Sequence, residues 1–221
     1  MKKRGEKLLC GGSLMLALFV VWTWLVQSVD VRPAGVLGTD IGFAEINVRF
    51  HELTGVHMWL YIVTDWLGLV PVFVCLLFGL VGMVQLVKRK SLHKVDRDII
   101  LLGLYYLLVV VCYLAFEQFP VNYRPILIEG RMEASYPSST TLLVLSVMPT
   151  LVFQIQRRWN GGKTKRMVSV ATVVFTAFMV IGRLMSGVHW LTDIVGSVLL
   201  SAGLFCIYIS AVLLLEREKN G

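Results

Sequence analysis

Residues 99–116 read IILLGLYYLLVVVCYLAF, a stretch of 18 residues without a charge. A helix that crosses the hydrocarbon core of a bilayer needs about 20 predominantly apolar residues. Stretches of comparable length and composition occur at 8–29, 66–87, 134–156, 167–182 and 194–215. The sequence therefore predicts an all-α, polytopic membrane protein built as a bundle of six transmembrane helices.

The composition of the whole chain agrees with this prediction. Of the 221 residues 57% are hydrophobic and 16% are charged, and the mean hydropathy is +0.74. No polar stretch reaches the roughly 50 residues that a separate soluble domain needs. We expect residues 1–221 to form a single membrane-embedded domain. The fifth stretch is the shortest, and we expect it to continue past Arg183, whose side chain must then face protein or water.

Lysine and arginine are distributed unevenly between the two ends of these helices. Sixteen of the 21 lie at the termini or in the connections 88–97 and 157–166, and five lie on the other side. Short connections rich in these residues stay in the cytoplasm, which predicts two cytoplasmic termini and a multi-pass protein of the cell membrane. The cations flank apolar helices and form no separate basic face, so the net charge of +7 does not indicate nucleic-acid binding.

The basic N-terminus followed by an apolar run also has the order of a cleaved signal peptide. However, the run 8–29 exceeds the roughly 7 to 15 apolar residues of such signals, and no small-x-small site follows it. Cys10 precedes the apolar core, which argues against a lipoprotein signal. Cys75, Cys112 and Cys206 lie inside predicted spans and form no CxxC or Cys/His cluster, so we expect core residues without a metal or another cofactor.

The first outer connection, 30–65, contains a helical pattern. Its apolar residues Phe43, Ile46, Phe50 and Leu53 alternate with Glu45, Arg49 and Glu52. This spacing predicts an amphipathic helix in the outer interface. Such a helix would cover the bundle or guard the lateral access of a lipid.

Polar residues gather at the outer ends of the third to sixth stretches. The clusters are EQFPVNYRP at 117–125, YPSST at 136–140 and GRLMSGVHWLTD at 182–193. Pro125 favours an extended backbone at Arg124, which aims the guanidinium from a stiff segment. Pro137 suits a first helical turn, where free N–H groups and the hydroxyls of 138–140 would form an anion site.

In the third cluster His189 and Asp193 are four residues apart. On a helix they would share a face, so Asp193 could hold one ring nitrogen while the other nitrogen faces a cavity. Each cluster alone has a purely structural explanation. Together they bring two guanidiniums, a helix N-terminus and an oriented imidazole to one membrane face, which is what phosphoryl transfer through a phosphohistidine requires.

These residues resemble the motifs of the type 2 phosphatidic acid phosphatase superfamily, which are Lys-x6-Arg-Pro, Pro-Ser-Gly-His and Ser-Arg-x5-His-x3-Asp. The resemblance covers most of the chain, including six spans and the order of the motifs. It implies an extracytoplasmic site in which His189 is the nucleophile and Asp193 its orienting carboxylate. It further implies that Arg124, Ser138 and Arg183 bind the phosphate.

The chain departs from the family motifs at four positions. Glu117 stands where the family has lysine, and Thr140 where it has the histidine that protonates the leaving group. Gly182 and Ser139 replace a serine and a glycine. The motif residues therefore carry no net charge instead of +2, and we expect weaker phosphate binding.

Three functions are compatible with these residues. The first is a lipid phosphatase that prefers a lipid diphosphate such as a polyprenyl diphosphate, because a phosphate leaving group does not need the missing acid. The second is a non-catalytic lipid-phosphate-binding membrane protein, with Glu117 paired to Arg124 or Arg183. The third is a transporter or channel, although the sequence contains no inverted repeat. The lipid and the oligomeric state stay open.

Overall fold

The computed structural model describes residues 2–218 and is almost entirely helical within them. Its long helices are α1 (Lys2–Ser28), α4 (Leu69–Arg89), α5 (Arg97–Gln118), α6 (Ser139–Arg158), α7 (Gly162–Met185) and α8 (Leu191–Glu218). Two shorter helices, α2 (Ala44–Thr54) and α3 (Met58–Leu67), and the 3-10 turns η1 (Val36–Gly38) and η2 (Leu92–Lys94) complete the described part. Within it, six helical segments are long and apolar enough to cross a membrane, which confirms the predicted class.

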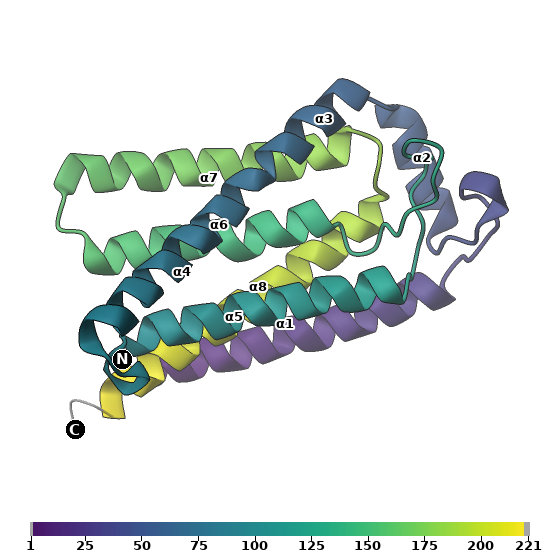
Figure 1. Cartoon of the computed structure of the whole chain (residues 1–221). Helices are drawn as coiled ribbons and strands as arrows, with labels where there is room; N and C mark the ends of the chain where they lie inside the picture. Colours follow the sequence, from purple (N-terminus) through teal and green to yellow (C-terminus); the bar gives the residue numbers. More distant parts are fainter. Residues whose placement is uncertain (1, 219–221) are drawn as a thin grey trace.

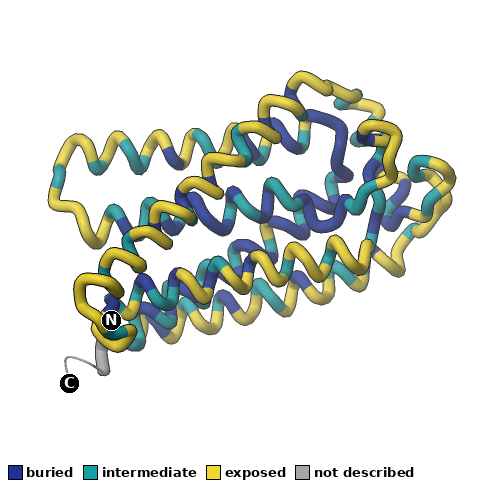
Figure 2. The backbone as a smooth tube through the Cα atoms, viewed as in Figure 1, coloured by how far each residue is buried: buried dark blue, intermediate teal, exposed yellow. Residues whose placement is uncertain are grey.

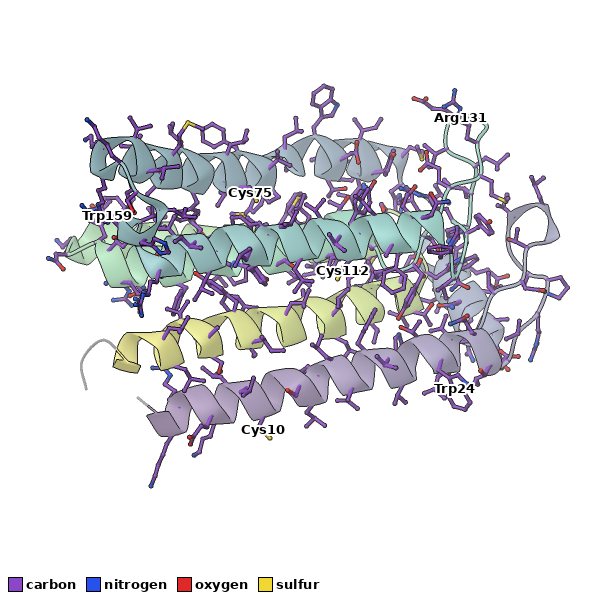
Figure 3. All side chains as sticks on the ribbon, turned by 60° about the horizontal axis from the view of Figure 1, so that its bottom comes forward. Cys10, Trp24, Cys75, Cys112, Arg131 and Trp159 are labelled. Atoms are coloured by element: carbon purple, nitrogen blue, oxygen red, sulfur yellow. The ribbon has the colours of Figure 1, made fainter. Side chains whose placement is uncertain are left out.

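The connections separate cleanly between the two ends of the bundle (Figure 1). One end, called the inner end here, holds the N-terminus, the end of α8 and the connections α4–α5 and α6–α7. The opposite, outer end holds α2 and the connections α5–α6 and α7–α8. In Figure 3, Trp24 and Arg131 lie toward the outer end and Trp159 lies at the inner end. The basic-rich segments of the sequence thus share one end.

Helices α6 and α8 form the centre of the bundle. Buried residues concentrate along them and toward the outer end (Figure 2). Helix α1 runs beside α8 and is joined to it at both ends, because Ser210 Oγ donates to the Gly5 carbonyl at 2.8 Å and Trp22 Nε1 donates to the Thr192 carbonyl at 3.2 Å. Large apolar side chains point outward all round the bundle, as expected of surfaces that contact lipid.

The second transmembrane segment begins earlier than predicted. Helices α3 and α4 together form one apolar segment over Met58–Arg89, whereas the charge of Asp65 had suggested a start at residue 66. The segment tolerates Asp65 because that carboxylate forms an ion pair with Arg183 of α7 at 3.0 Å. Arg183 itself is buried before the end of α7 at Met185, which confirms that the fifth span continues past it.

The predicted amphipathic helix is present as α2. Ile46 and Leu53 are exposed, while Ala44 and Asn47 face the protein. Hydrogen bonds determine this orientation of α2. The Asn47 side chain donates to the Gly42 carbonyl at 2.8 Å and to Thr192 Oγ1 at 3.0 Å. Ile46 and Leu53 therefore do not cover the bundle.

Ion pairs join three helices at the inner end. Asp96 pairs with Arg89 at 2.7 Å and with Arg158 at 3.0 Å, and Arg158 also pairs with Asp98 at 2.6 Å. We call these four residues the inner clamp. The hydrogen bond from Arg89 is the main cause that lowers the pKa of Asp96 to about 2. Asp96 is therefore charged at every physiological pH.

Candidate active site

His189 lies in the turn between α7 and α8, not on a helix as the spacing to Asp193 had suggested. Gly187 has φ of 71° and ends the helical path, and α8 begins only at Leu191. The His189 ring is buried, and its Nδ1 is 3.1 Å from the Ser135 carbonyl oxygen. A carbonyl can only accept, so Nδ1 carries the hydrogen and Nε2 the free lone pair. Nε2 has no partner among the described residues.

Asp193 supports the His189 turn from the first turn of α8. Its Oδ2 accepts a hydrogen bond from the Trp190 backbone N–H at 2.9 Å, as an acidic residue at the third helical position does in a capping box. The same oxygen is 3.6 Å from His189 Nδ1. This distance is too long for a hydrogen bond, so the Ser135 carbonyl is the acceptor of the His189 ring N–H, and no sequence motif pointed to Ser135.

The surroundings of His189 keep its ring neutral. Burial lowers its pKa well below the usual value near 6.5, and the charges of Arg124 and Arg183 lower it further. The Ser135 carbonyl acts in the opposite direction but does not offset these effects. An uncharged imidazole with a free Nε2 is the form that can attack phosphorus.

The Arg183 side chain extends from α7 and forms hydrogen bonds with residues of α3 and α6. Its Nη1 donates to the Tyr61 carbonyl and to Thr64 Oγ1, both at 3.3 Å, and its Nη2 donates to Asp65 Oδ1 at 3.0 Å and to Thr140 Oγ1 at 2.8 Å. Its Nε is buried without a partner among the described residues. The guanidinium is thus fixed in place and still has a donor to offer.

Arg124 approaches from the hairpin-like connection between α5 and α6. Its backbone N–H donates to the Glu133 carbonyl at 3.0 Å, and its Nη2 pairs with the Glu133 carboxylate at 3.1 Å. Nε and Nη1 are buried and find no partner in the part of the chain that the structure describes. The Tyr61 ring lies beside both arginines, with its centroid 5.7 Å from Arg124 Cζ and 4.7 Å from Arg183 Cζ.

Of the polar residues at the start of α6, Thr140 bonds to Arg183, whereas Ser138 bonds to neighbouring residues of the protein. Pro137 precedes the helix rather than entering its first turn, and Ser138 is the capping residue. Ser138 is buried, its Oγ donates to Thr141 Oγ1 at 3.0 Å, and its N–H donates to the Asp193 carbonyl at 3.3 Å. Thr140 contacts Arg183 directly. The N–H groups of the first turn remain available to an anion, as at any helix start.

In the part of the chain that the structure describes, Glu117 does not pair with either arginine, although the hypothesis of a non-catalytic lipid-phosphate-binding protein had assumed this pairing. It is exposed at the end of α5, and no ion pair joins it to Arg124 or Arg183 within residues 2–218. The carboxylates that pair with these arginines are Glu133 and Asp65. The balance of charge at the site is therefore set by two residues that the sequence motifs do not include.

Helix α3 supplies the part of the site that sequence reasoning missed. Tyr61, Thr64 and Asp65 all contact Arg183, and their spacing of three and four residues places them on one face of the helix. That polar face within an apolar stretch was the available signal. It was overlooked because the charge of Asp65 was used as the boundary of the span.

Comparison with known proteins identifies the family. The sequence model of the PAP2 superfamily matches residues 102–216, which include both arginines, the start of α6, His189 and Asp193. The chain belongs to the PAP2 superfamily. Among solved structures, this PAP2 protein is similar to a transmembrane PAP2-type phosphatidylglycerolphosphate phosphatase from Bacillus subtilis, with a TM-score of 0.64, 17% identity and coverage of 93% of this chain and 96% of that one. No curated protein sequence matches it.

The family assignment and the fold agree with each other. Both describe a multi-pass membrane protein with the architecture of a membrane lipid phosphatase. Helix α3 lies outside the residues matched to the PAP2 superfamily, whereas the site it contacts lies within them. The Tyr61, Thr64 and Asp65 contacts thus reach the site from a helix outside the matched residues.

Proposed function

We propose that this PAP2 protein is a lipid phosphatase that acts through a phosphohistidine on His189. One observation carries the proposal: buried nitrogens of Arg124, Arg183 and His189 have no partner among the described residues. Buried polar groups are nearly always paired, and each unpaired one costs about 1 to 3 kcal/mol. Two guanidiniums and the amides that start α6 form a site for a phosphate, with the imidazole as its nucleophile.

In this mechanism Nε2 of His189 forms a bond to phosphorus while the bond to the leaving oxygen breaks. The Ser135 carbonyl holds Nδ1–H, and the Asp193 carboxylate, 3.6 Å away, would stabilise the positive charge that the ring gains. Arg124, Arg183 and Ser138 would bind the phosphoryl oxygens, the last after its hydroxyl turns away from Thr141. No cofactor takes part in this scheme.

The preferred substrate in this proposal is a lipid diphosphate such as a polyprenyl diphosphate. The Thr140 hydroxyl is too weak an acid to protonate a leaving group at neutral pH, and its oxygen already accepts a hydrogen bond from Arg183. A lipid alkoxide needs a proton as it leaves, whereas a lipid monophosphate leaves as a stabilised anion. General acid catalysis typically contributes about 10² to 10⁴-fold, so its absence would disfavour monophosphates by that order.

The ion pairs of the two arginines favour a second function, a non-catalytic lipid-phosphate-binding protein. Arg124 pairs with the carboxylate of Glu133, and Arg183 pairs with that of Asp65. Both carboxylates reduce the positive charge that would stabilise phosphoryl transfer, which fits a family member that binds lipid phosphates without hydrolysing them. Turnover by the purified protein separates the two functions.

The decisive experiment is phosphate release from a matched panel of lipids. Purified protein in detergent is offered farnesyl diphosphate, farnesyl monophosphate and phosphatidic acid, and we expect kcat/KM for the diphosphate to exceed the others by at least about 100-fold. His189→Ala protein prepared in the same way is the control for contaminating phosphatases. Absence of turnover above that control, with measurable binding of the lipids, would support the non-catalytic binder.

The proposed location is the cell membrane, with both termini in the cytoplasm and the site outside. The excess of lysine and arginine at the inner end supports this orientation. We expect an Arg131→Cys variant to react with a membrane-impermeant maleimide in intact cells, because Arg131 is exposed at the outer end. Trp159→Cys, at the inner end, should react only after lysis, and the unsubstituted protein gives the background. The reverse pattern would invert the orientation.

A further inference from the structure

A groove leads from the outer end of the bundle down between α4, α5 and α6. Its volume is about 410 Å³. Apolar residues line most of it, among them Leu69, Val72, Val109, Val110 and Leu143, whereas Asp65, Ser139 and Thr140 form a polar border. The groove therefore meets the phosphate site at Thr140, which is bonded to Arg183.

Asp65 stands at the junction of the groove and the phosphate site. Its carboxylate bonds the same Arg183 nitrogen as Thr140 does, at 3.0 and 2.8 Å respectively. Its side chain is 56% exposed, while that of Arg183 is 1% exposed. Asp65 Oδ1 thus bonds the buried guanidinium of Arg183, while the rest of the Asp65 carboxylate faces the groove.

The departure at Gly182 leaves space for α3 beside α7. A Cβ at Gly182 would lie 2.8 Å from Thr64 Cγ2, so the serine of the family motif would require Thr64 to move. Gly182 therefore permits the close contact between α3 and α7 in which Asp65 and Thr140 bond the same nitrogen of Arg183.

We propose that Asp65 is the general base that activates water for hydrolysis of the phosphohistidine, in place of the side chain that Thr140 lacks. This inference rests on the proposed function. The leaving group and the attacking water occupy the same side of phosphorus, opposite the His189 nitrogen, because displacement at phosphorus is in line. The lipid chain reaches the site through the groove, so this side is the one that Asp65 borders.

The chemistry balances without a further reactant. Asp65 accepts a proton from water as the water oxygen bonds to phosphorus and the bond from phosphorus to His189 Nε2 breaks. The electron pair of that bond returns to the imidazole, and inorganic phosphate is released. After the lipid product has left the groove, Asp65 passes this proton to solvent from its exposed side.

The test is whether removing the carboxylate makes the phosphoenzyme accumulate. Asp65→Asn keeps the shape and a hydrogen-bonding oxygen for Arg183 but cannot take up a proton. With farnesyl diphosphate labelled in its terminal phosphate, we expect a burst of farnesyl monophosphate close to one per protein. A slow steady state should follow, about 10² to 10⁴-fold below wild type in kcat. The label should stay on the protein in alkali and be lost in acid, as phosphohistidine requires.

Glu133→Gln is the matched control, because it also removes a carboxylate from a phosphate-binding arginine but does not line the groove. It should change KM without trapping label. A purely positioning role for Asp65 would make Asp65→Asn behave like Glu133→Gln, and that result would overturn the proposal. Partial recovery of kcat in Asp65→Glu would support it. Absence of both turnover and label in the wild type would refute the proposed function itself, a different outcome.

Discussion

Replacement of His189 by alanine should reduce phosphate release to the background of the assay. The covalent route then has no nucleophile, and losses on the order of 10⁶-fold follow such removals in enzymes that use covalent catalysis. In this PAP2 protein the ring is buried, neutral and held at Nδ1 by the Ser135 carbonyl, so no neighbouring group can replace its free Nε2. The measurement is initial phosphate release from the preferred lipid of the panel.

Loss of activity in His189→Ala is informative only if the variant is still folded. Since alanine leaves a cavity between α7 and α8, His189→Gln serves as a second variant of similar volume that also lacks the nucleophile. Both should keep the helical content and unfolding temperature in detergent close to wild type. Wild-type turnover in either folded variant would be incompatible with a phosphohistidine.

Arg183→Lys should lower kcat/KM by about 10² to 10³-fold, the effect of removing one well-placed donor to a developing charge. Lysine keeps the positive charge and can still pair with Asp65. It has no planar fork, however, and cannot donate at once to the α3 contacts, to Thr140 and to a phosphate. Steady-state kinetics on the preferred lipid measures the loss.

The control for Arg183→Lys is the same substitution at Arg131, an exposed arginine of the outer end. Arg131→Lys should leave kcat/KM within about twofold, as surface changes remote from a site usually do. Equal effects of the two substitutions would mean that Arg183 contributes only charge. Its four hydrogen bonds would then have no role in binding phosphate.

The transmembrane architecture was predictable because hydropathy and charge bias are local properties of the chain. Segments such as 99–116 need no tertiary information to be assigned to a bilayer. The motif residues were also predictable as a group, and the structure brings Arg124, Thr140, Arg183, His189 and Asp193 together. Their functional roles remain proposals that the experiments above test.

The errors arose where distant parts of the chain decide the outcome. Asp65 was placed in a connection because a lone carboxylate is unfavourable in a bilayer, yet its partner Arg183 lies in α7. The spacing of His189 and Asp193 would put them on one face if both were helical, yet Gly187 introduces a turn and α8 begins only at Leu191. The inward face of α2 could not be predicted either, because the hydrogen bonds of Asn47 to Gly42 and Thr192 determine it.

The inner clamp of Arg89, Asp96, Asp98 and Arg158 places the ion pairs that join α4, α5 and α6 at the end of the bundle opposite the site. These are the same three helices that line the groove. If a lipid enters the groove as proposed, we expect the three helices to separate more easily at their outer ends, where no inner-clamp residue joins them. Entry of the lipid would then widen the space beside Asp65 and Thr140.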